Sequence, residues 1–532
     1  MSGENARLYN DDDAVIHEQR VSSSSENEIS EWARDREAQA GFHHSQASLP
    51  VSILLAQLFL SIWAALIHYL SWKRIRQVLR PSFLSGSDGE HEKSRGGANG
   101  ALDGLRGVSC LIVALYHFFG EFYELDKGYI WDWDSPNGGP LATWLNLPIV
   151  KAFYNGPNMV AIFFMISGYV LSHRFIELIR RGQIDKALGS MPSAIFRRWM
   201  RLFFPVGVSF AITGFLVWCG IYEYSRTQHD GYAESMGHLP GPFPKRGENA
   251  WDQMSIWLQT WRHLFHSFTW ERYGPVDIDS DAWTISVEYR SSIVVFMSVI
   301  ALARVRRLIL RLSLIVLIMA WAIQWEPRAW EVVLFLGGTF VAEINVANRL
   351  SMELGCDATE KHRSHLRMSS HWWMVVMVVM MYLISVPSLH LYDSDPGWGW
   401  HLLRDIGKIP SSYLFNMYQF LGALLLILAT TNWEPLQHLL NMPVPQYLGR
   451  LSYSLYLVHG PWVKLCGWAL VPRFLNIVYG RLGSLDRDFN ASACLGFLIF
   501  MPTTIYFADI FMRYVDIPSV KMSRQIWDFC TS

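Results

Sequence analysis

The strongest constraint on this chain is a series of apolar segments, each about as long as a membrane is thick. A helix of roughly 18–24 apolar residues crosses about 30 Å of hydrocarbon. Segments of this kind lie at 51–71, 105–122, 158–176, 202–220, 282–303, 309–325, 330–347, 371–391, 411–431, 451–471 and 491–514. We therefore expect an all-α membrane protein with a core of about ten transmembrane helices and one extra N-terminal hydrophobic helix.

The composition agrees with lipid as the surrounding solvent. Hydrophobic residues make up 51% of the chain and charged residues 17%, against about 25% charged residues in soluble proteins. The formal net charge of −1 gives no reason to expect a nucleic-acid partner. Membrane lipid is an expected partner, and nucleic acid is not.

Four regions differ in character along the chain. Residues 1–50 hold ten acidic and four basic residues with little apolar periodicity, so we expect a disordered acidic tail without a secretory signal. Residues 51–100 combine the extra hydrophobic helix, which could span the membrane or lie in its interface, with a polar linker. Residues 101–520 form the transmembrane core, and 521–532 form a short tail.

Lysine and arginine are unevenly distributed between alternate loops. One set of loops, which includes 513–532, holds 25 of these residues, and the opposite set holds 13 in a similar length. Because cytosolic loops carry the excess, we expect an integral multi-pass protein with a cytosolic C-terminus. The choice between an endomembrane and the plasma membrane stays open.

The six cysteines are scattered and form no Cys-x-x-Cys pair. None lies near a histidine at the spacing of a zinc site, so the sequence predicts neither a metal site nor a disulfide framework.

Ionisable residues inside apolar helices are costly and need a reason. Arg106 and His117 lie eleven residues apart in LDGLRGVSCLIVALYHFFGEF. At about 100° per residue they share one helical stripe, with His117 about 16 Å deeper than Arg106. A histidine there can act as a general base. The alternative is a histidine that is hydrogen-bonded between helices.

Two further segments carry ionisable groups. Glu288, close to Ser286 in DAWTISVEYRSSIVVFM, could orient a histidine or bind a positive group, or form an internal ion pair. His459 lies in the polar segment YLGRLSYSLYLVHGPW, where the alternative is polar contact between helices.

Two motifs support a site. In FFMISGY, Ser167 and the following glycine form a small-residue pair that permits close approach of a backbone or a ligand. In FRRWMR, Arg197, Arg198 and Arg201 lie at the expected cytosolic mouth of a span, where they could bind phosphate or serve as ordinary positive anchors.

Together these stretches resemble the acyltransferase 3 family of integral membrane acyltransferases, in a form similar to fungal members. The matching motifs are LDGLRG with the arginine–ten residues–histidine pattern, FFMISGYVLS, FRRWMR, WTISVEYR, FLGGTF and LGRLSYSLYLVH, in the family's order over roughly 101–520. The extra N-terminal segment and Arg290 depart from many bacterial members, so acceptor choice can differ.

The resemblance implies acyl transfer from cytosolic acyl-CoA, often acetyl-CoA, to a hydroxyl of a sugar, glycan or small molecule, with no permanently bound cofactor. It makes His117 the catalytic histidine, Arg106 its paired arginine and Glu288 the motif's acidic residue. It links Arg198 and Arg201 to the acyl donor, and His459 matches a recurring position.

Two other functional classes compete with this interpretation. Buried histidine, glutamate and arginine also occur in proton-coupled transporters, although the two halves of the chain show no internal repeat. A non-catalytic membrane scaffold would keep the same motifs as structure. Turnover of acyl-CoA by wild type, and its loss in a folded His117→Ala variant, would favour the enzyme over the transporter and the scaffold.

Overall fold

The computed structural model describes residues 82, 97–123, 125, 149–233, 241–268, 278–325, 329–353, 369–386, 411–482 and 485–532. Two compact units divide the chain, Met1–Arg80 and Pro81–Ser532, and all the described residues belong to the second. The predicted acidic tail at 1–50 and the extra hydrophobic helix at 51–71 therefore lie outside the described residues.

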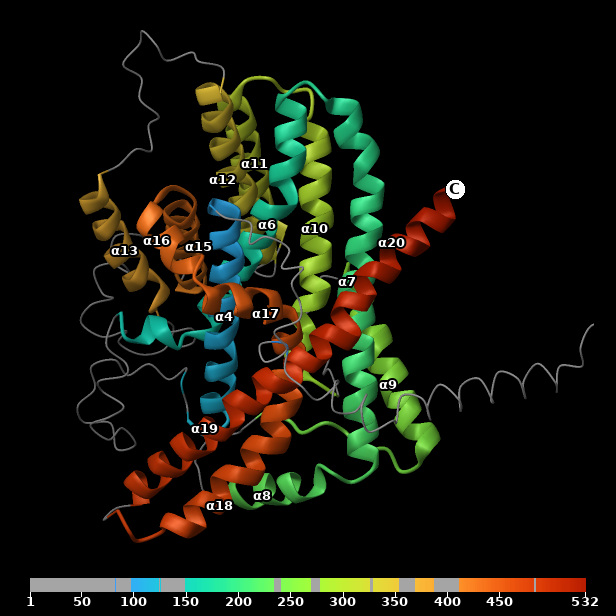
Figure 1. Cartoon of the computed structure of the whole chain (residues 1–532), viewed down its shortest axis with the longest axis vertical. Helices are drawn as coiled ribbons and strands as arrows, with labels where there is room; N and C mark the ends of the chain where they lie inside the picture. Colours follow the sequence, from blue (N-terminus) through green and yellow to red (C-terminus); the bar gives the residue numbers. More distant parts are fainter. Residues whose placement is uncertain are drawn as a thin grey trace, which may run out of the picture. The chain divides into compact units, whose positions relative to one another are not determined.

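The regular structure of the described residues is helical throughout, as the sequence predicts (Figure 1). The α-helices are α4 (Ala98–Gly120), α6 (Gly156–Arg180), α7 (Ile184–Trp218), α8 (Glu223–Ala233), α9 (Ala250–Leu264), α10 (Trp283–Leu302), α11 (Leu308–Trp325), α12 (Trp330–Glu353), α13 (Ser370–Ile384), α15 (Ser411–Asn432), α16 (Glu434–Leu440), α17 (Pro443–Trp462), α18 (Trp468–Val478), α19 (Leu485–Phe511) and α20 (Ile517–Thr531). Short 3₁₀ turns occur at η2 (Lys151–Phe153) and η3 (Ser280–Ala282), and π-helical turns at η5 (Val463–Gly467) and η6 (Met512–Asp516).

Six helical stretches of the described chain are long and apolar enough to cross a membrane, which confirms the predicted all-α membrane fold. They are Ala98–Gly120, Gly156–Arg180, Ile184–Trp218, Ser280–Leu302, Trp330–Glu353 and Arg487–Thr531. Each apolar segment predicted between 105 and 514 overlaps a helix.

Two predicted segments differ in shape from the helices they overlap. The segment at 202–220 belongs to α7, which begins eighteen residues before it. The first half of α7 is polar but is helical all the same. The segment at 451–471 is interrupted: α17 carries Pro461 inside its last turn, the π-helical turn η5 follows, and α18 begins at Trp468. Proline removes a backbone donor and disturbs the helical ladder, which accounts for the break.

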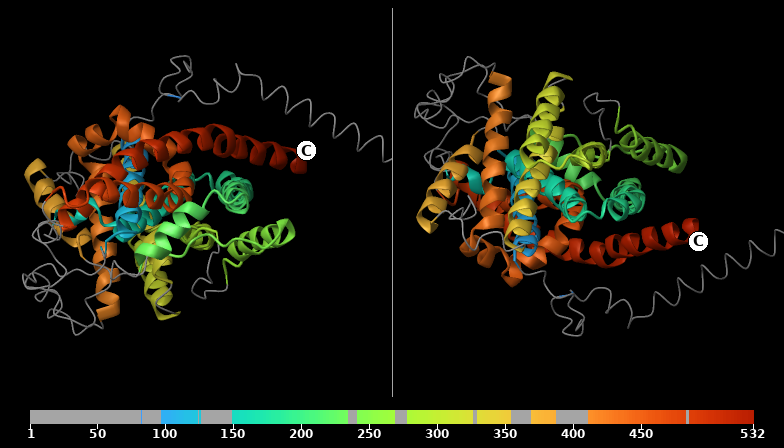
Figure 2. Two further views of the ribbon diagram at one scale, coloured as in Figure 1. Left: turned by 90° about the horizontal axis from the view of Figure 1, so that it is seen from below. Right: turned by 90° about the horizontal axis from the view of Figure 1, so that it is seen from above.

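Helix α4 lies near the centre of the helices in both views of Figure 2, while α7 and α9 lie on the side opposite α13. Helix α4 packs chiefly against α17 and α6, and α6 packs against α12. The two helices of the α4–α17 pair and of the α6–α12 pair approach closely because a glycine on one helix faces the backbone of the other. A Cβ on Gly107 would overlap the backbone of Gly449 and Leu448 of α17, and one on Gly168 would overlap the Phe335 carbonyl of α12. Small residues at helix contacts let backbones approach in this way.

We expect Gly168→Ala to destabilise the protein by about 1–3 kcal/mol, because the added methyl group has to push α6 and α12 apart. The matched control is Gly189→Ala on α7, where a Cβ would meet no atom within 4 Å. That change should be neutral or raise stability by about 1 kcal/mol through helix propensity. Thermal unfolding in detergent measures both, and equal melting temperatures for Gly168→Ala and wild type would contradict the close contact.

A buried ion cluster joins α6, α11 and α12. Glu343 of α12 has a side chain only 1% exposed and lies between Arg180 of α6 and Arg311 of α11. Arg180 donates from Nε and Nη2 to Glu343 Oε2 over 3.1 and 2.7 Å, and Arg311 donates from Nε to Oε1 over 2.8 Å. Arg311 also donates 2.6 Å to the carbonyl oxygen of Leu302, at the end of α10. One carboxylate therefore fixes three helices.

Candidate active site

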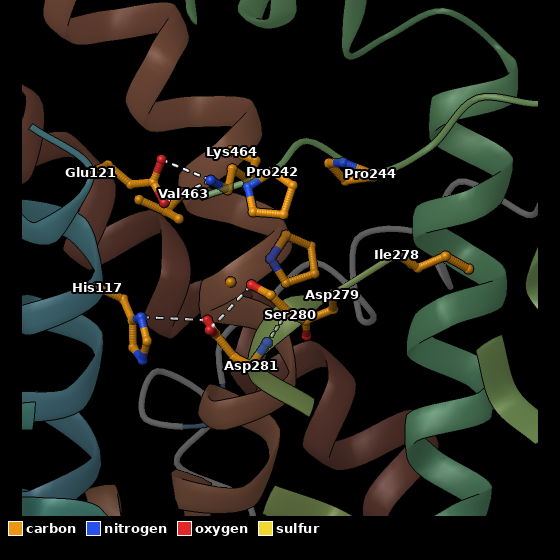
Figure 3. A pocket seen from close by; sticks show the side chains of 12 residues that line it. His117, Glu121, Pro242, Pro244, Ile278, Asp279, Ser280, Asp281, Val463 and Lys464 are labelled. Carbon is orange, nitrogen blue, oxygen red and sulfur yellow. Dashed lines mark hydrogen bonds and ion pairs between the residues drawn. The ribbon is translucent and has the colours of Figure 1, made fainter. Parts of the chain in front are cut away.

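Three side chains from separate elements meet near the end of α4. His117 lies in the last turn of α4, Asp281 lies in η3 just before α10, and His459 lies near the end of α17. The Oδ2 atom of Asp281 is 3.5 Å from His117 Nδ1 and 3.7 Å from His459 Nε2. The two imidazole ring centroids are 5.1 Å apart. Figure 3 shows His117 directed toward Asp281 across the pocket.

The backbone around Asp281 is held by its neighbours. Asp279 accepts a 3.1 Å hydrogen bond from the Asp281 backbone N–H, and the Tyr456 hydroxyl donates to the Asp281 carbonyl oxygen. Burial and the adjacent Asp281 carboxylate raise the pKa of Asp279 well above its ordinary value. Gly460 makes room for both acids, because a Cβ there would lie 2.7 Å from Asp279 Oδ1 and 3.0 Å from Asp281 Oδ2.

His459 is 1% exposed and has a defined tautomer. Its Nδ1 lies 2.6 Å from the Tyr456 carbonyl oxygen and 3.2 Å from that of Leu455. Both carbonyls can only accept, so Nδ1 carries the proton of the neutral ring and Nε2 carries a lone pair. Within the described residues this buried Nε2 has no hydrogen-bond partner, and it faces the Asp281 carboxylate.

His117, Asp279, Asp281 and Gly460 line a pocket of about 340 Å³, a volume that includes space open to solvent. A buried ion pair bounds it: Lys464 Nζ lies 2.7 and 2.8 Å from the two Glu121 oxygens. Trp468 Nε1 donates 2.9 Å to Glu121, and Lys464 also donates to the Gly241 carbonyl oxygen. The pair thus holds the start of the segment 241–247 beside the pocket, which Pro242 also lines (Figure 3). The His117 side chain is 32% exposed, the largest exposed fraction of the three side chains that meet near the end of α4.

Glu288 lies in a second cluster, with arginine and serine. Arg198 Nη2 is 2.8 Å from Glu288 Oε1, and the Ser167 hydroxyl donates 3.2 Å to the same oxygen. Arg198 Nε also donates 2.5 Å to Ser292 Oγ. The ion pair with another helix that the sequence left open is therefore the observed arrangement, and the carboxylate beside His117 belongs to Asp281.

The remaining candidates lie around this second cluster or apart from it. Arg106 donates 3.0 Å to Ser452 Oγ and 3.1 Å to the Gly449 carbonyl, and it interacts electrostatically with Arg201 and Glu288. Arg201 is exposed, and half-buried Arg197 donates 3.1 Å to the Ser193 carbonyl. Ser286 donates 2.7 Å to the Leu264 carbonyl, so it ties α10 to α9 instead of facing either cluster.

A sequence profile of an acyltransferase domain, that of the acyltransferase 3 family, matches residues 99–513, most of the chain. The chain belongs to the acyltransferase 3 family. It is 28% identical over 471 residues to O-acetyltransferase PaAT-1 of Phomopsis amygdali, covering 84% of this chain and 87% of that protein. It is 25% identical over 466 residues to acyltransferase clz18 of Cochliobolus lunatus, covering 79% and 94%. No solved structure matches the chain.

Membership confirms the resemblance seen in the motifs and makes the protein an acyltransferase, not the transporter or scaffold weighed against it. Sequence reasoning passed over Asp281, Asp279 and Lys464 of this acyltransferase. Lys464 is a lysine within the predicted apolar segment 451–471, and an ionisable residue in such a segment is a signal that could have found it. Asp281 starts the quoted stretch DAWTISVEYR, but nothing in the sequence distinguishes it from an ordinary residue before a helix.

Proposed function

We propose that this acyltransferase moves an acetyl group from acetyl-CoA to a hydroxyl of a sugar, a glycan or a small molecule, with His117 as the general base. One observation carries the proposal: a half-exposed histidine at the pocket has one ring nitrogen 3.5 Å from a carboxylate oxygen. A carboxylate in that position orients a basic histidine and stabilises its protonated form. The name of the relative PaAT-1, an O-acetyltransferase, supports acetyl as the group and oxygen as the acceptor atom.

In the proposed reaction the acceptor oxygen attacks the thioester carbonyl carbon while its proton passes to His117. Asp281 faces Nδ1, so Nε2 is the nitrogen left to accept that proton. The carbon–sulfur bond then breaks, the ester is released, and protonated His117 gives its proton to the CoA thiolate. General-base help of this kind contributes about 10²–10⁴-fold. We assign the role of orienting His117 to Asp281 in place of Glu288, because Glu288 pairs with Arg198.

The acyl donor is proposed to enter from the arginine cluster. CoA carries phosphates on its nucleotide, and guanidinium groups bind phosphate through charge-assisted hydrogen bonds. Arg201 is exposed, and Arg106 lies on the same stripe of α4 as His117. Eleven residues of helix separate Arg106 from His117 by about 16 Å, a distance that the long pantetheine arm of CoA can bridge.

We expect Arg201→Gln and Arg197→Gln each to raise the KM for acetyl-CoA about 10-fold with little change in kcat, since each removes one charged contact to a phosphate. Arg181→Gln is the matched control, because Arg181 is an exposed arginine at the end of α6, where it pairs with Glu177 and Glu353. Initial rates at varied acetyl-CoA separate KM from kcat. A pure fall in kcat would contradict donor binding by these arginines.

The experiment that tests the function uses the full chain purified in detergent with acetyl-CoA labelled in the acetyl group. Acceptors are offered in matched pairs, a sugar or small alcohol against the same molecule with an amine in place of the hydroxyl. We expect label in an alkali-labile ester with the hydroxylated member of at least one pair. A folded protein that labels only amines, or that labels no hydroxylated acceptor in the panel, contradicts the proposal.

A further inference from the structure

We propose that His117, Asp281 and His459 also form a binding site for a divalent transition-metal ion of the Zn²⁺ type, and that occupancy of this site stops acyl transfer. The binding part stands by itself on the three side chains. The inhibition part rests on the proposed function, in which His117 has to accept a proton.

The spacing of the three side chains fits one ion. Their ligand atoms all lie within 4.8 Å of one another, and the Asp281 oxygen is 3.5 and 3.7 Å from the two histidine nitrogens. Bonds of about 2.0–2.2 Å in a tetrahedral shell place neighbouring ligand atoms about 3.3–3.6 Å apart. The His117 side chain, 32% exposed against 18% for Asp281 and 1% for His459, is the least confined of the three, and we expect it to rotate to complete the contact.

The chemistry of His459 gives the second argument. A metal-binding histidine characteristically donates its other ring N–H to a backbone carbonyl, which fixes the tautomer and aims the lone pair at the ion. His459 makes this contact through Nδ1 to Tyr456, and its buried Nε2 has no hydrogen-bond partner among the described residues. A buried lone pair facing a carboxylate is unfavourable because neither group can donate a hydrogen bond, and either a proton or a metal cation between them removes the repulsion.

The donor set selects the ion. Two imidazole nitrogens and one carboxylate suit Zn²⁺ and similar first-row ions, whereas Mg²⁺ prefers a shell of oxygen atoms. Three protein ligands also leave a fourth position for water. Cysteine and histidine spacing predicted no metal site. It could not reveal this one, because the ligands come from α4, η3 and α17.

Occupancy would block the base through His117. When the ion takes the Nδ1 lone pair, the single proton of the neutral imidazole resides on Nε2. That nitrogen then has no lone pair with which to receive the acceptor's proton. The ion also engages Asp281, which can no longer stabilise a protonated His117.

The binding test uses the full chain in detergent, stripped of metal with a chelator and titrated with Zn²⁺ against a chromophoric chelator. We expect one ion per chain, and affinity lowered about 10- to 100-fold or more in His459→Gln and in Asp281→Asn. His229→Gln is the matched control, because His229 also lies beside an aspartate, with Nδ1 2.8 Å from Asp230 Oδ1, but belongs to no three-ligand group among the described residues. Thermal melts verify that each variant is folded.

A second readout keeps the test decisive if a variant does not fold. Co²⁺ bound to wild type should give the visible absorption of a tetrahedral nitrogen–oxygen site, and Zn²⁺ should displace it. Wild type that binds no Zn²⁺, or variants that bind it as tightly as wild type does, would overturn the proposal.

Inhibition of acetyl transfer is measured in a separate experiment. Zn²⁺ should stop acetyl transfer by wild type at the concentrations that fill the site, and Mg²⁺ should not. If wild type transfers no acetyl group but binds one Zn²⁺, the metal site stands and the proposed function fails. If it transfers acetyl and Zn²⁺ binds without slowing the reaction, the inhibition is wrong and the function stands.

Discussion

Replacing His117 by alanine is expected to lower the rate of acyl transfer by about 10²–10⁴-fold, because the acceptor hydroxyl loses the base that takes its proton. The loss should appear in kcat, with the KM for acetyl-CoA nearly unchanged, since His117 lies about 16 Å along α4 from Arg106. The fold should survive, because the side chain is 32% exposed and faces the pocket. The measurement is initial rate against acetyl-CoA concentration, with a thermal melt of each protein.

The matched control is His229→Ala, since His229 is also paired with an aspartate but does not line the pocket. Asp281→Asn should give a smaller loss than His117→Ala, because the base remains but its protonated form loses the carboxylate. A folded His117→Ala protein with wild-type kcat would remove His117 from the reaction. A loss in Asp281→Asn with none in His117→Ala would place the base elsewhere in the pocket.

Replacing Glu343 by alanine is expected to destabilise the protein by about 3–5 kcal/mol, because two buried arginines lose their shared carboxylate. Arg311 is 1% exposed and Arg180 15% exposed, so water cannot replace the lost partner of Arg311. Their like charges then also face one another across the vacated space. Melting temperature in detergent and expression level measure the effect.

Glu353→Ala is the matched control, since Glu353 ends the same helix α12 and also pairs with an arginine, Arg181. Its side chain is 45% exposed, and exposed ion pairs contribute about 0–1 kcal/mol. Glu343→Gln should lie between the two, because the amide keeps hydrogen-bond acceptance but removes the charge. Equal melting temperatures for Glu343→Ala and Glu353→Ala would show that the buried cluster is not a source of stability.

The helices themselves could be predicted from apolar runs, because a lipid solvent requires each span to satisfy its own backbone. The small pair in FFMISGY correctly indicated close approach, which α6 makes to α12 at Gly168. The polar first half of α7 was not predicted, because no apolar run marks the residue where that helix begins. The break at the end of α17 lies inside the predicted segment 451–471, and the π-helical turn that follows it was not predicted.

The sequence indicated the two histidines of the candidate site but not the carboxylate between them. His117 and His459 stood out separately as histidines in apolar helices, yet their meeting depends on how α4 crosses α17. The carboxylate was harder to assign. Asp281 and Glu288 are seven residues apart, almost two helical turns, so they share a stripe about 10 Å apart in height. Only the tertiary structure determines that the first faces His117 and the second faces Arg198.

The glycine contacts between α4 and α17 have a consequence for how this enzyme can change during evolution. His117 and His459 are carried by two backbones that touch at Gly107 and Gly449, so their separation depends on main chain and not on adjustable side-chain packing. The segment 241–247, in contrast, meets the pocket through the Lys464–Glu121 pair and through prolines. We therefore expect substitutions in that segment to alter the choice of acceptor more readily than the proposed chemical step.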